Sequence, residues 1–226
     1  MSDERPHLSG GRPVAGIAGH RHRRYWGGLA AIAVAGIFLT ALLGSPGGVR
    51  GVAAGSRVPP FAAPLATGSL SRYDTDIATA PHQGSAGSRP ACSVRGAQVL
   101  NVCELYERAP LVLALFVDGG SCTAILRQLQ SLVASFAQVR FAAVAIKGEA
   151  PGVRALIRAD RLTFPVGLDR DGSLVTLYKL ATCPQVNFVY PGGVVQSAAL
   201  LGEPSEATLR TRVRALLAAA REHGWR

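Results

Sequence analysis

The chain has 226 residues, which suits one folded domain with additional segments, and 48% of them are hydrophobic, which excludes a largely disordered protein. Its formal net charge of +10 comes almost entirely from arginine, because Lys147 and Lys179 are the only lysines. No basic run interleaved with aromatic residues occurs in the part expected to fold, so we do not expect nucleic acid as a partner.

The N-terminal part predicts a membrane anchor. Residues 1–25 are polar and rich in arginine, and we interpret them as a disordered cytoplasmic tail. Residues 26–44 carry no charge, are about long enough to cross a bilayer, and begin with Trp26 where aromatic rings prefer the interface. More arginines precede this segment than follow it, which predicts that the N-terminus is cytoplasmic and the rest lies outside the cell membrane. A cleaved signal peptide is the competing interpretation, but the long polar region and the lack of a clean cleavage site favour a single-pass anchor.

Residues 45–90 are predicted to connect the anchor to the folded domain. Residues 45–57 contain Gly, Ser and Pro, and we interpret them as a flexible linker. The prolines of residues 58–65, VPPFAAPL, favour an extended backbone. Residues 66–90 have no apolar period and are interpreted as a long loop or disordered segment. The folded domain is therefore expected over residues 91–226.

The first part of this domain contains two of the four cysteines. Residues 91–105, ACSVRGAQVLNVCEL, hold two short β-like runs around Arg95 and Gly96. A structural disulfide between Cys92 and Cys103 would join these runs and contribute about 2–3 kcal/mol by loop-closure entropy. An even number of cysteines, all after the predicted anchor, fits an oxidising compartment. Their spacing matches neither a zinc nor a haem site, so no metal or cofactor is expected.

Residues 111–136 predict a strand, a tight turn and a helix. Residues 111–117 are an unbroken apolar run, which is typical of a strand covered on both faces. After Asp-Gly-Gly, Ser121 is a good N-cap and would place Cys122 in the first helical turn. Unpaired N–H groups and the helix dipole would there favour the thiolate of Cys122 and lower its pKa.

The remaining pattern predicts an α/β domain. Residues 139–147 form a second buried strand, so strand, helix and strand make a βαβ unit with parallel strands and a right-handed crossover. The following elements complete a mixed sheet between helices: a helix from Pro151, a strand at 164–168, a helix at 174–180, a hairpin at 185–201 and a helix from 204 to 224.

From Leu111 onward the chain resembles the thioredoxin fold, and more narrowly the redoxin group. This group contains membrane-anchored thiol–disulfide oxidoreductases and the alkyl hydroperoxide reductase and thiol-specific antioxidant proteins. The similar stretches are LVLALFV, GGSCTAILRQLQSL, FPVGLDRDGSLVTLYKL and, most specifically, CPQVNFVYPGGVV. The resemblance implies a thioredoxin-like mixed central sheet flanked by helices. It also implies that Pro184 is a cis-proline lying against the active-site cysteines.

The cysteine motif departs from both branches of this group. The oxidoreductases carry W-C-x-x-C at the start of the first helix, and with Cys122 as the second cysteine the first is replaced by Gly119. The peroxiredoxin pattern P-x-x-x-T-x-x-C has Gly119 in place of threonine and Leu115 in place of proline. Neither motif is intact. Because Gly119 stands where the first cysteine of W-C-x-x-C would be, a pair of thiols within the first helix is impossible.

The resemblance instead places Cys183, directly before Pro184, across a short gap from Cys122. We predict that Cys122 and Cys183 form a reversible disulfide in which Cys122 has the lower pKa, with Arg140 or Arg170 as possible helpers. The alternatives are a permanent structural disulfide and two buried free thiols.

Three functions follow from this hypothesis. The favoured one is a membrane-tethered thiol–disulfide oxidoreductase that acts on thiols or disulfides of exported proteins. The second is a peroxidase, in which a peroxide oxidises Cys122 to sulfenic acid and Cys183 or Cys92 resolves it. The third is a redox-inactive thioredoxin-like module that binds an exported partner.

Overall fold

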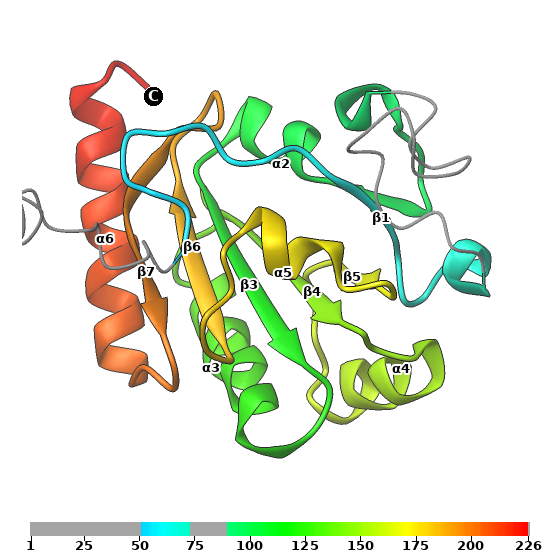
Figure 1. Ribbon diagram of the computed structural model, residues 1–226. Helices are drawn as coiled ribbons and strands as arrows, with labels where there is room; N and C mark the ends of the chain where they lie inside the picture. The colour runs from blue at the N-terminus through cyan, green and yellow to red at the C-terminus, as the bar shows by residue number, and fades with distance from the viewer. Residues whose placement is uncertain (1–50, 73–89, 226) are drawn as a thin grey trace, which may run out of the picture. The chain divides into compact units, whose positions relative to one another are not determined.

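The computed structural model describes residues 51–72 and 90–225 (Figure 1). These belong to one compact unit. The predicted cytoplasmic tail, residues 1–25, and the predicted anchor, residues 26–44, lie outside the described residues. None of the helices within the described ranges is long and apolar enough to cross a membrane.

A five-stranded mixed sheet with the strand order β5-β4-β3-β6-β7 forms the centre of this unit (Figure 1). β3 is parallel to β4 and antiparallel to β6, β4 is parallel to β5, and β6 is antiparallel to β7. The predicted βαβ unit and C-terminal hairpin are therefore present, and the expected mixed sheet is confirmed. The strands are β3 (Leu111–Val117), β4 (Arg140–Ile146), β5 (Val166–Asp169), β6 (Gln185–Val189) and β7 (Val195–Leu201).

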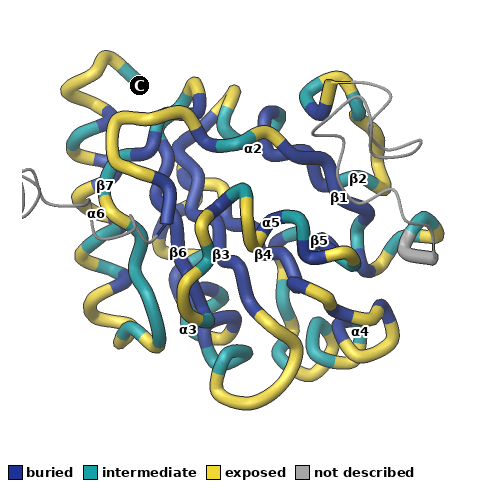
Figure 2. The backbone as a smooth tube through the Cα atoms, viewed as in Figure 1, coloured by how far each residue is buried: buried dark blue, intermediate teal, exposed yellow. Residues whose placement is uncertain are grey.

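Helices cover both faces of the sheet, which explains the unbroken apolar run of β3. Alternate side chains of a strand point to opposite faces, so both sets in β3 must be buried. Val112 and Phe116 pack in the layer formed with α3, α4 and α6, whereas Leu113 and Leu115 pack in the layer with α2 and α5. Figure 2 shows the resulting buried centre. The helices are α2 (Val102–Arg108), α3 (Ala124–Val133), α4 (Ala150–Ala159), α5 (Ser173–Leu177) and α6 (Glu206–Glu222).

Residues 51–72, which were expected to belong to a connector, form part of the folded unit. Phe61 is fully buried and packs edge-on against Tyr178, with ring centroids 5.9 Å apart. The Tyr178 hydroxyl donates to the Pro59 carbonyl at 2.9 Å, and burial raises the pKa of Tyr178 well above its usual value. Arg154 Nε likewise donates to the Ala66 carbonyl at 2.6 Å. The extended segment is thus held to the domain by both apolar burial and hydrogen bonds.

Residues 91–105 also differ from the prediction of two β-like runs. Their first part is a 3-10 turn at Ala91–Ser93, and only β2 (Val99–Asn101) is a strand. β2 pairs antiparallel with β1 (Ala62–Pro64) in a separate two-stranded sheet. The second run ends at Asn101, whose side chain accepts hydrogen bonds from the first N–H groups of α2 and starts that helix. Cys103 therefore lies in a helix and not in a strand.

The hairpin turn between β6 and β7 provides a test of how closely Tyr106 packs against it. Gly193 has a φ of +85°, and a Cβ at this position would lie 2.8–3.0 Å from three ring atoms of Tyr106. We expect Gly193→Ala to reduce the free energy of unfolding by about 2–3 kcal/mol, because it adds a steric clash to an unfavourable backbone conformation. Urea unfolding measures this loss.

Gly192→Ala is the matched control for this prediction. Gly192 has a similar φ of +86°, but a Cβ there would meet no atom within 4 Å. This variant should therefore lose less free energy of unfolding than Gly193→Ala, because only the backbone conformation is unfavourable. Equal losses in the two variants would contradict the contribution assigned to Tyr106.

Candidate functional site

Cys122 and Cys183 are joined by a disulfide bond, and their Cα atoms are 5.5 Å apart. The sheet explains how cysteines 61 residues apart meet. Cys122 follows the end of β3, Cys183 precedes the start of β6, and these strands are antiparallel neighbours. Both cysteines are half-buried. The structure thus brings together the two residues that the sequence analysis selected, while their catalytic role stays a prediction.

The backbone around Cys122 differs from the prediction. Ser121 does not cap an α-helix, because residues Gly120–Thr123 form a 3-10 turn and α3 begins only at Ala124. Gly119 and Gly120 have φ angles of +119° and +61°, and this conformation turns the chain directly from β3 into the 3-10 turn. Cys122 therefore precedes the first turn of α3. Because the 3-10 turn runs directly into α3, Cys122 still lies at the N-terminal end of a helical segment, and the lowered pKa of this thiol stays a prediction.

Cys183 is fixed more closely by its surroundings. The main-chain N–H of Val117 donates a hydrogen bond to the Sγ atom of Cys183 at 3.1 Å. The Cys183–Pro184 peptide bond is cis, as the resemblance implied. Pro184 is buried, and its carbonyl accepts from the N–H of Gly202 at 2.9 Å. Cys183 is thus held between the end of β3 and the start of β6.

Two buried polar residues, which the sequence analysis did not select, follow Pro184 in β6. Gln185 Nε2 donates to the Tyr178 carbonyl at 3.1 Å, and Asn187 Nδ2 donates to the Leu113 carbonyl at 3.4 Å. Both side chains are almost completely buried. The alternation of polar and apolar residues in QVNFV is the signal that could have identified them. They link the strand that follows the disulfide to α5 and β3.

Of the two arginines considered as helpers of the disulfide, Arg140 lies away from it. Arg140 is the first residue of β4 and is in register with Leu111, which places it at the opposite end of the sheet from Cys122. Arg170 follows β5, two strands away from β3, and its guanidinium forms an ion pair with Glu149 at 3.7 Å. The structure therefore does not support a role for Arg140 in the chemistry of the disulfide.

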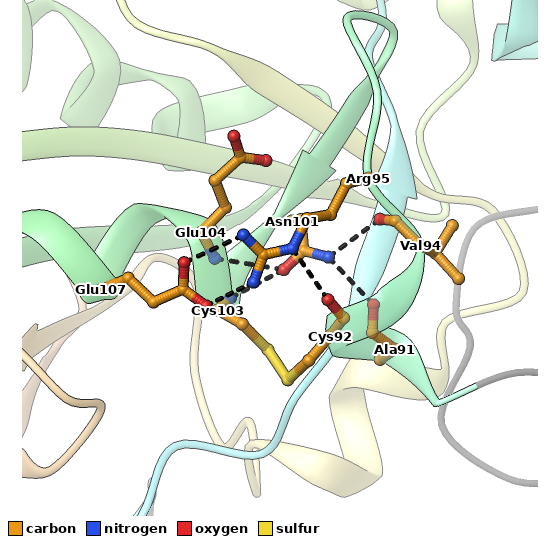
Figure 3. Close-up of polar contacts among 8 residues, drawn as sticks. All are labelled: Ala91, Cys92, Val94, Arg95, Asn101, Cys103, Glu104 and Glu107. Atoms are coloured by element: carbon orange, nitrogen blue, oxygen red, sulfur yellow. Dashed lines mark hydrogen bonds and ion pairs between the residues drawn. A yellow bond between two sulfur atoms is a disulfide. The ribbon is translucent and has the colours of Figure 1, made fainter.

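The second disulfide joins Cys92 and Cys103, with Cα atoms 5.4 Å apart (Figure 3). The buried Asn101 side chain reinforces this region from inside, since Nδ2 donates to the Ala91 carbonyl at 2.9 Å and to the Val94 carbonyl at 2.8 Å. Its Oδ1 accepts from the N–H of Cys103 at 2.9 Å. The 3-10 turn and α2 are therefore held together by a disulfide and by one amide side chain.

An exposed ion pair lies beside this disulfide. Arg95 forms a two-point contact with the carboxylate of Glu107, and its Nε donates to the Cys92 carbonyl at 3.1 Å. Hydrogen bonding from Arg95 lowers the pKa of Glu107. The contribution of this pair to stability is therefore present above the ordinary pKa of a glutamate and is lost as the pH falls through the lowered value. Because both side chains are 41% exposed, we expect this contribution to be small.

Removing the Cys92–Cys103 disulfide is expected to destabilise the domain. The bond closes a short loop of sequence separation 11. A double change, Cys92→Ala with Cys103→Ala, should lower the free energy of unfolding by about 2–3 kcal/mol, because the unfolded chain gains conformational freedom. Urea unfolding at equal protein concentration measures the effect. An unchanged unfolding midpoint would show that the bond does not brace this segment.

One cavity lies away from the Cys122–Cys183 disulfide. It has a volume of about 430 Å³ and is lined by residues that include Arg108, Arg140 and Phe164, at the opposite end of the sheet. No group of three His, Cys, Asp or Glu side chains in the described ranges is placed to hold a metal ion.

No family model matches the chain, and a comparison with curated proteins gives no match either. Solved structures are similar, at low sequence identity. A candidate thiol:disulfide interchange protein DsbE from Chlorobium tepidum has a TM-score of 0.55 and 15% identity, over 74% of this chain and 99% of that protein. A candidate protein disulfide isomerase from Bacteroides thetaiotaomicron has a TM-score of 0.55 and 13% identity, over 76% and 95%. A thioredoxin family thiol:disulfide interchange protein from Chlorobium tepidum TLS has a TM-score of 0.53 and 13% identity, over 74% and 99%. At these identities the comparisons show a shared fold.

Proposed function

Given this thioredoxin-like redoxin fold, we propose that the protein is a thiol–disulfide oxidoreductase and that Cys122–Cys183 is its exchangeable disulfide. The observation that carries the proposal is the position of this half-buried disulfide, at the end of the central strand and beside the cis-proline Pro184. A substrate thiolate attacks one sulfur and forms a mixed disulfide, and a second substrate thiolate then resolves it. Two substrate thiols become a disulfide, and the pair of cysteines takes up the two electrons. The reverse reaction reduces a substrate disulfide.

The contrast between the two disulfides supports this assignment. Cys92 is half-buried, but its partner Cys103 is 2% exposed and is held in place by Asn101, as suits a structural bond. Cys122, in contrast, follows five exposed residues, 117–121, and a Cβ added at Gly119 or Gly120 would meet no atom within 4 Å. An attacking sulfur needs such access to one side of the bond. The open surroundings favour exchange at Cys122–Cys183 over a permanent brace.

Oxidation of a model substrate tests the proposal. The oxidised protein is mixed with a reduced peptide that contains two cysteines, and the peptide disulfide is quantified by mass spectrometry after alkylation. We expect a stoichiometric amount of peptide disulfide to form, with loss of the Cys122–Cys183 bond. Oxidation no faster than in peptide alone, with both protein disulfides intact, would support the redox-inactive binding module instead.

We further propose that residues 26–44 anchor this domain in the cell membrane on the extracytoplasmic side, where its partners are thiols or disulfides of exported proteins. The uncharged segment and the arginines before it support this orientation. Two disulfides in the folded unit fit an oxidising compartment.

Membrane extraction tests this location. We expect the full chain to stay in the membrane pellet after alkaline carbonate treatment and to be digested by protease added from outside. Release into the supernatant, or protection of the domain until the membrane is broken, would contradict the proposal.

A further inference from the structure

The N–H of Val117 makes the two sulfurs of the Cys122–Cys183 disulfide unequal. Val117 is the last residue of β3, and the pairing of β3 with β6 ends earlier, at Leu115. The N–H group of Val117 therefore meets no carbonyl of β6 and instead donates to Cys183 Sγ at 3.1 Å. The sulfur of Cys183 thus lies where the hydrogen-bond ladder between β3 and β6 would continue.

Cys122 has no comparable donor. In the part of the chain that the structure describes, no hydrogen bond ends on its sulfur, and it lies in the 3-10 turn before α3. It also directly follows the exposed residues Gly119, Gly120 and Ser121, whereas Cys183 packs against the buried layer beneath α3 and precedes the buried Pro184. The exposed neighbours therefore lie beside Cys122, whereas the hydrogen-bond donor lies beside Cys183.

We infer that the substrate sulfur bonds to Cys122, that Cys183 is the leaving sulfur, and that the main-chain N–H of Val117 is a catalytic group that stabilises the departing thiolate. This inference rests on the proposed exchange function. In this step the substrate thiolate forms a bond to Cys122 Sγ, the Cys122–Cys183 bond breaks, and its electron pair leaves on Cys183 Sγ. The negative charge passes from the substrate sulfur to Cys183, so the step needs no other oxidant or proton donor.

The physical reason is the difference between a disulfide sulfur and a thiolate as hydrogen-bond acceptors. A neutral sulfur is a weak acceptor, whereas a bond from N–H to an ionised group is shorter and stronger. The Val117 bond therefore strengthens as charge develops on Cys183, and a better-stabilised thiolate leaves faster. This assignment reverses the sequence-based expectation that Cys122 is the more stabilised thiolate.

The nearest charge along the chain does not cancel this effect directly. Asp118 follows Val117, and its carboxylate would oppose a thiolate on Cys183. A Cβ added at Gly152 would lie 2.5 Å from Asp118 Oδ2, so this carboxylate packs against the first turn of α4. Asp118 is also exposed, so solvent screens its charge.

The first test locates the mixed disulfide. The oxidised full chain is treated briefly with reduced glutathione, quenched with N-ethylmaleimide and analysed by peptide mass spectrometry. We expect glutathione on Cys122 and maleimide on Cys183, in several-fold excess over the opposite arrangement. Glutathione mainly on Cys183 would overturn the inference and leave the exchange function intact. A lack of any mixed disulfide would count against both, and the second test then decides the role of Val117 separately.

The second test titrates each thiol alone. Cys122→Ala and Cys183→Ala each leave one free thiol while Cys92–Cys103 stays closed, and thiolate absorbance at 240 nm is followed against pH. We expect Cys183 to ionise about one pH unit below Cys122, through its charge-assisted hydrogen bond. Ionisation of Cys122 at the same or a lower pH would overturn the inference.

Changes at Val117, made together with Cys122→Ala, separate the N–H group from the side chain. Val117→Pro removes the N–H and should raise the pH at which Cys183 ionises, whereas Val117→Ala keeps the N–H and should leave it unchanged. An unchanged titration in a folded proline variant would overturn the role of Val117. If the proline variant does not fold, the comparison of the two single-cysteine variants still decides the inference.

Discussion

Replacing Cys122 with alanine is expected to reduce the oxidation of a two-cysteine peptide to the uncatalysed background. The variant has no disulfide at the end of β3, so a substrate thiolate finds no sulfur to attack there. Cys183→Ala should cause the same loss, because the disulfide is again missing. The measurement is the initial rate of peptide oxidation by equal amounts of each oxidised protein.

The control for this prediction is the double variant Cys92→Ala with Cys103→Ala, assayed where it is folded. It should keep peptide oxidation close to that of the unchanged protein, because its Cys122–Cys183 bond is intact. Retained activity in Cys122→Ala, together with a loss in the double variant, would mean that the other disulfide performs the exchange.

Asn101→Ala is expected to cause the largest loss of stability among the single substitutions considered, about 3–4 kcal/mol. The side chain caps α2 through the N–H groups of Cys103 and Glu104, and it donates to the carbonyls of Ala91 and Val94. Its removal leaves these groups without their partners in a region that is largely buried. Urea unfolding monitored by circular dichroism measures the loss.

Asn101→Asp separates the two roles of this side chain. Aspartate keeps an oxygen that can cap α2, but it has no N–H group for the carbonyls of Ala91 and Val94. We therefore expect it to remain strongly destabilising at neutral pH. A loss below about 1 kcal/mol in Asn101→Ala would contradict the central position assigned to this amide.

The central sheet could be predicted because its signals are local and strong. The apolar run from Leu111 to Val117 is typical of a strand covered on both faces, and the structure buries it from Leu111 to Phe116 between helices on both sides. The helical spacing of Leu209, Val213 and Leu216 similarly predicts the buried side of α6, where all three are fully buried. Patterns of this kind depend on the period of the backbone and little on distant residues.

The errors in the prediction arise where a few polar atoms or a backbone angle decide the structure. Short apolar runs around Cys103 fit a strand as well as a helix, and the capping bonds of Asn101 decide for the helix. Ser121 is a suitable capping residue by type, but the positive φ angles of Gly119 and Gly120 lead the chain into a 3-10 turn. Composition alone does not give these angles.

The candidate site was predictable as a pair of residues but not as a geometry. The resemblance around Pro184 indicated that Cys183 faces Cys122, and the two are bonded in the structure. The hydrogen bond from Val117 to Cys183 depends on where the pairing of β3 and β6 ends, and this register results from the packing of the whole sheet. The relative roles of the two sulfurs therefore emerge only from the three-dimensional structure.

The reduction potential of Cys122–Cys183 tests the proposed exchange most directly. The full chain is equilibrated with thiol–disulfide buffers of known potential, alkylated, and analysed by peptide mass spectrometry so that the two disulfides are measured separately. An exchangeable bond should have a potential above about −300 mV, while Cys92–Cys103 should be reduced only below that value. A potential of Cys122–Cys183 below about −300 mV would mark it as a structural bond and contradict the proposed function.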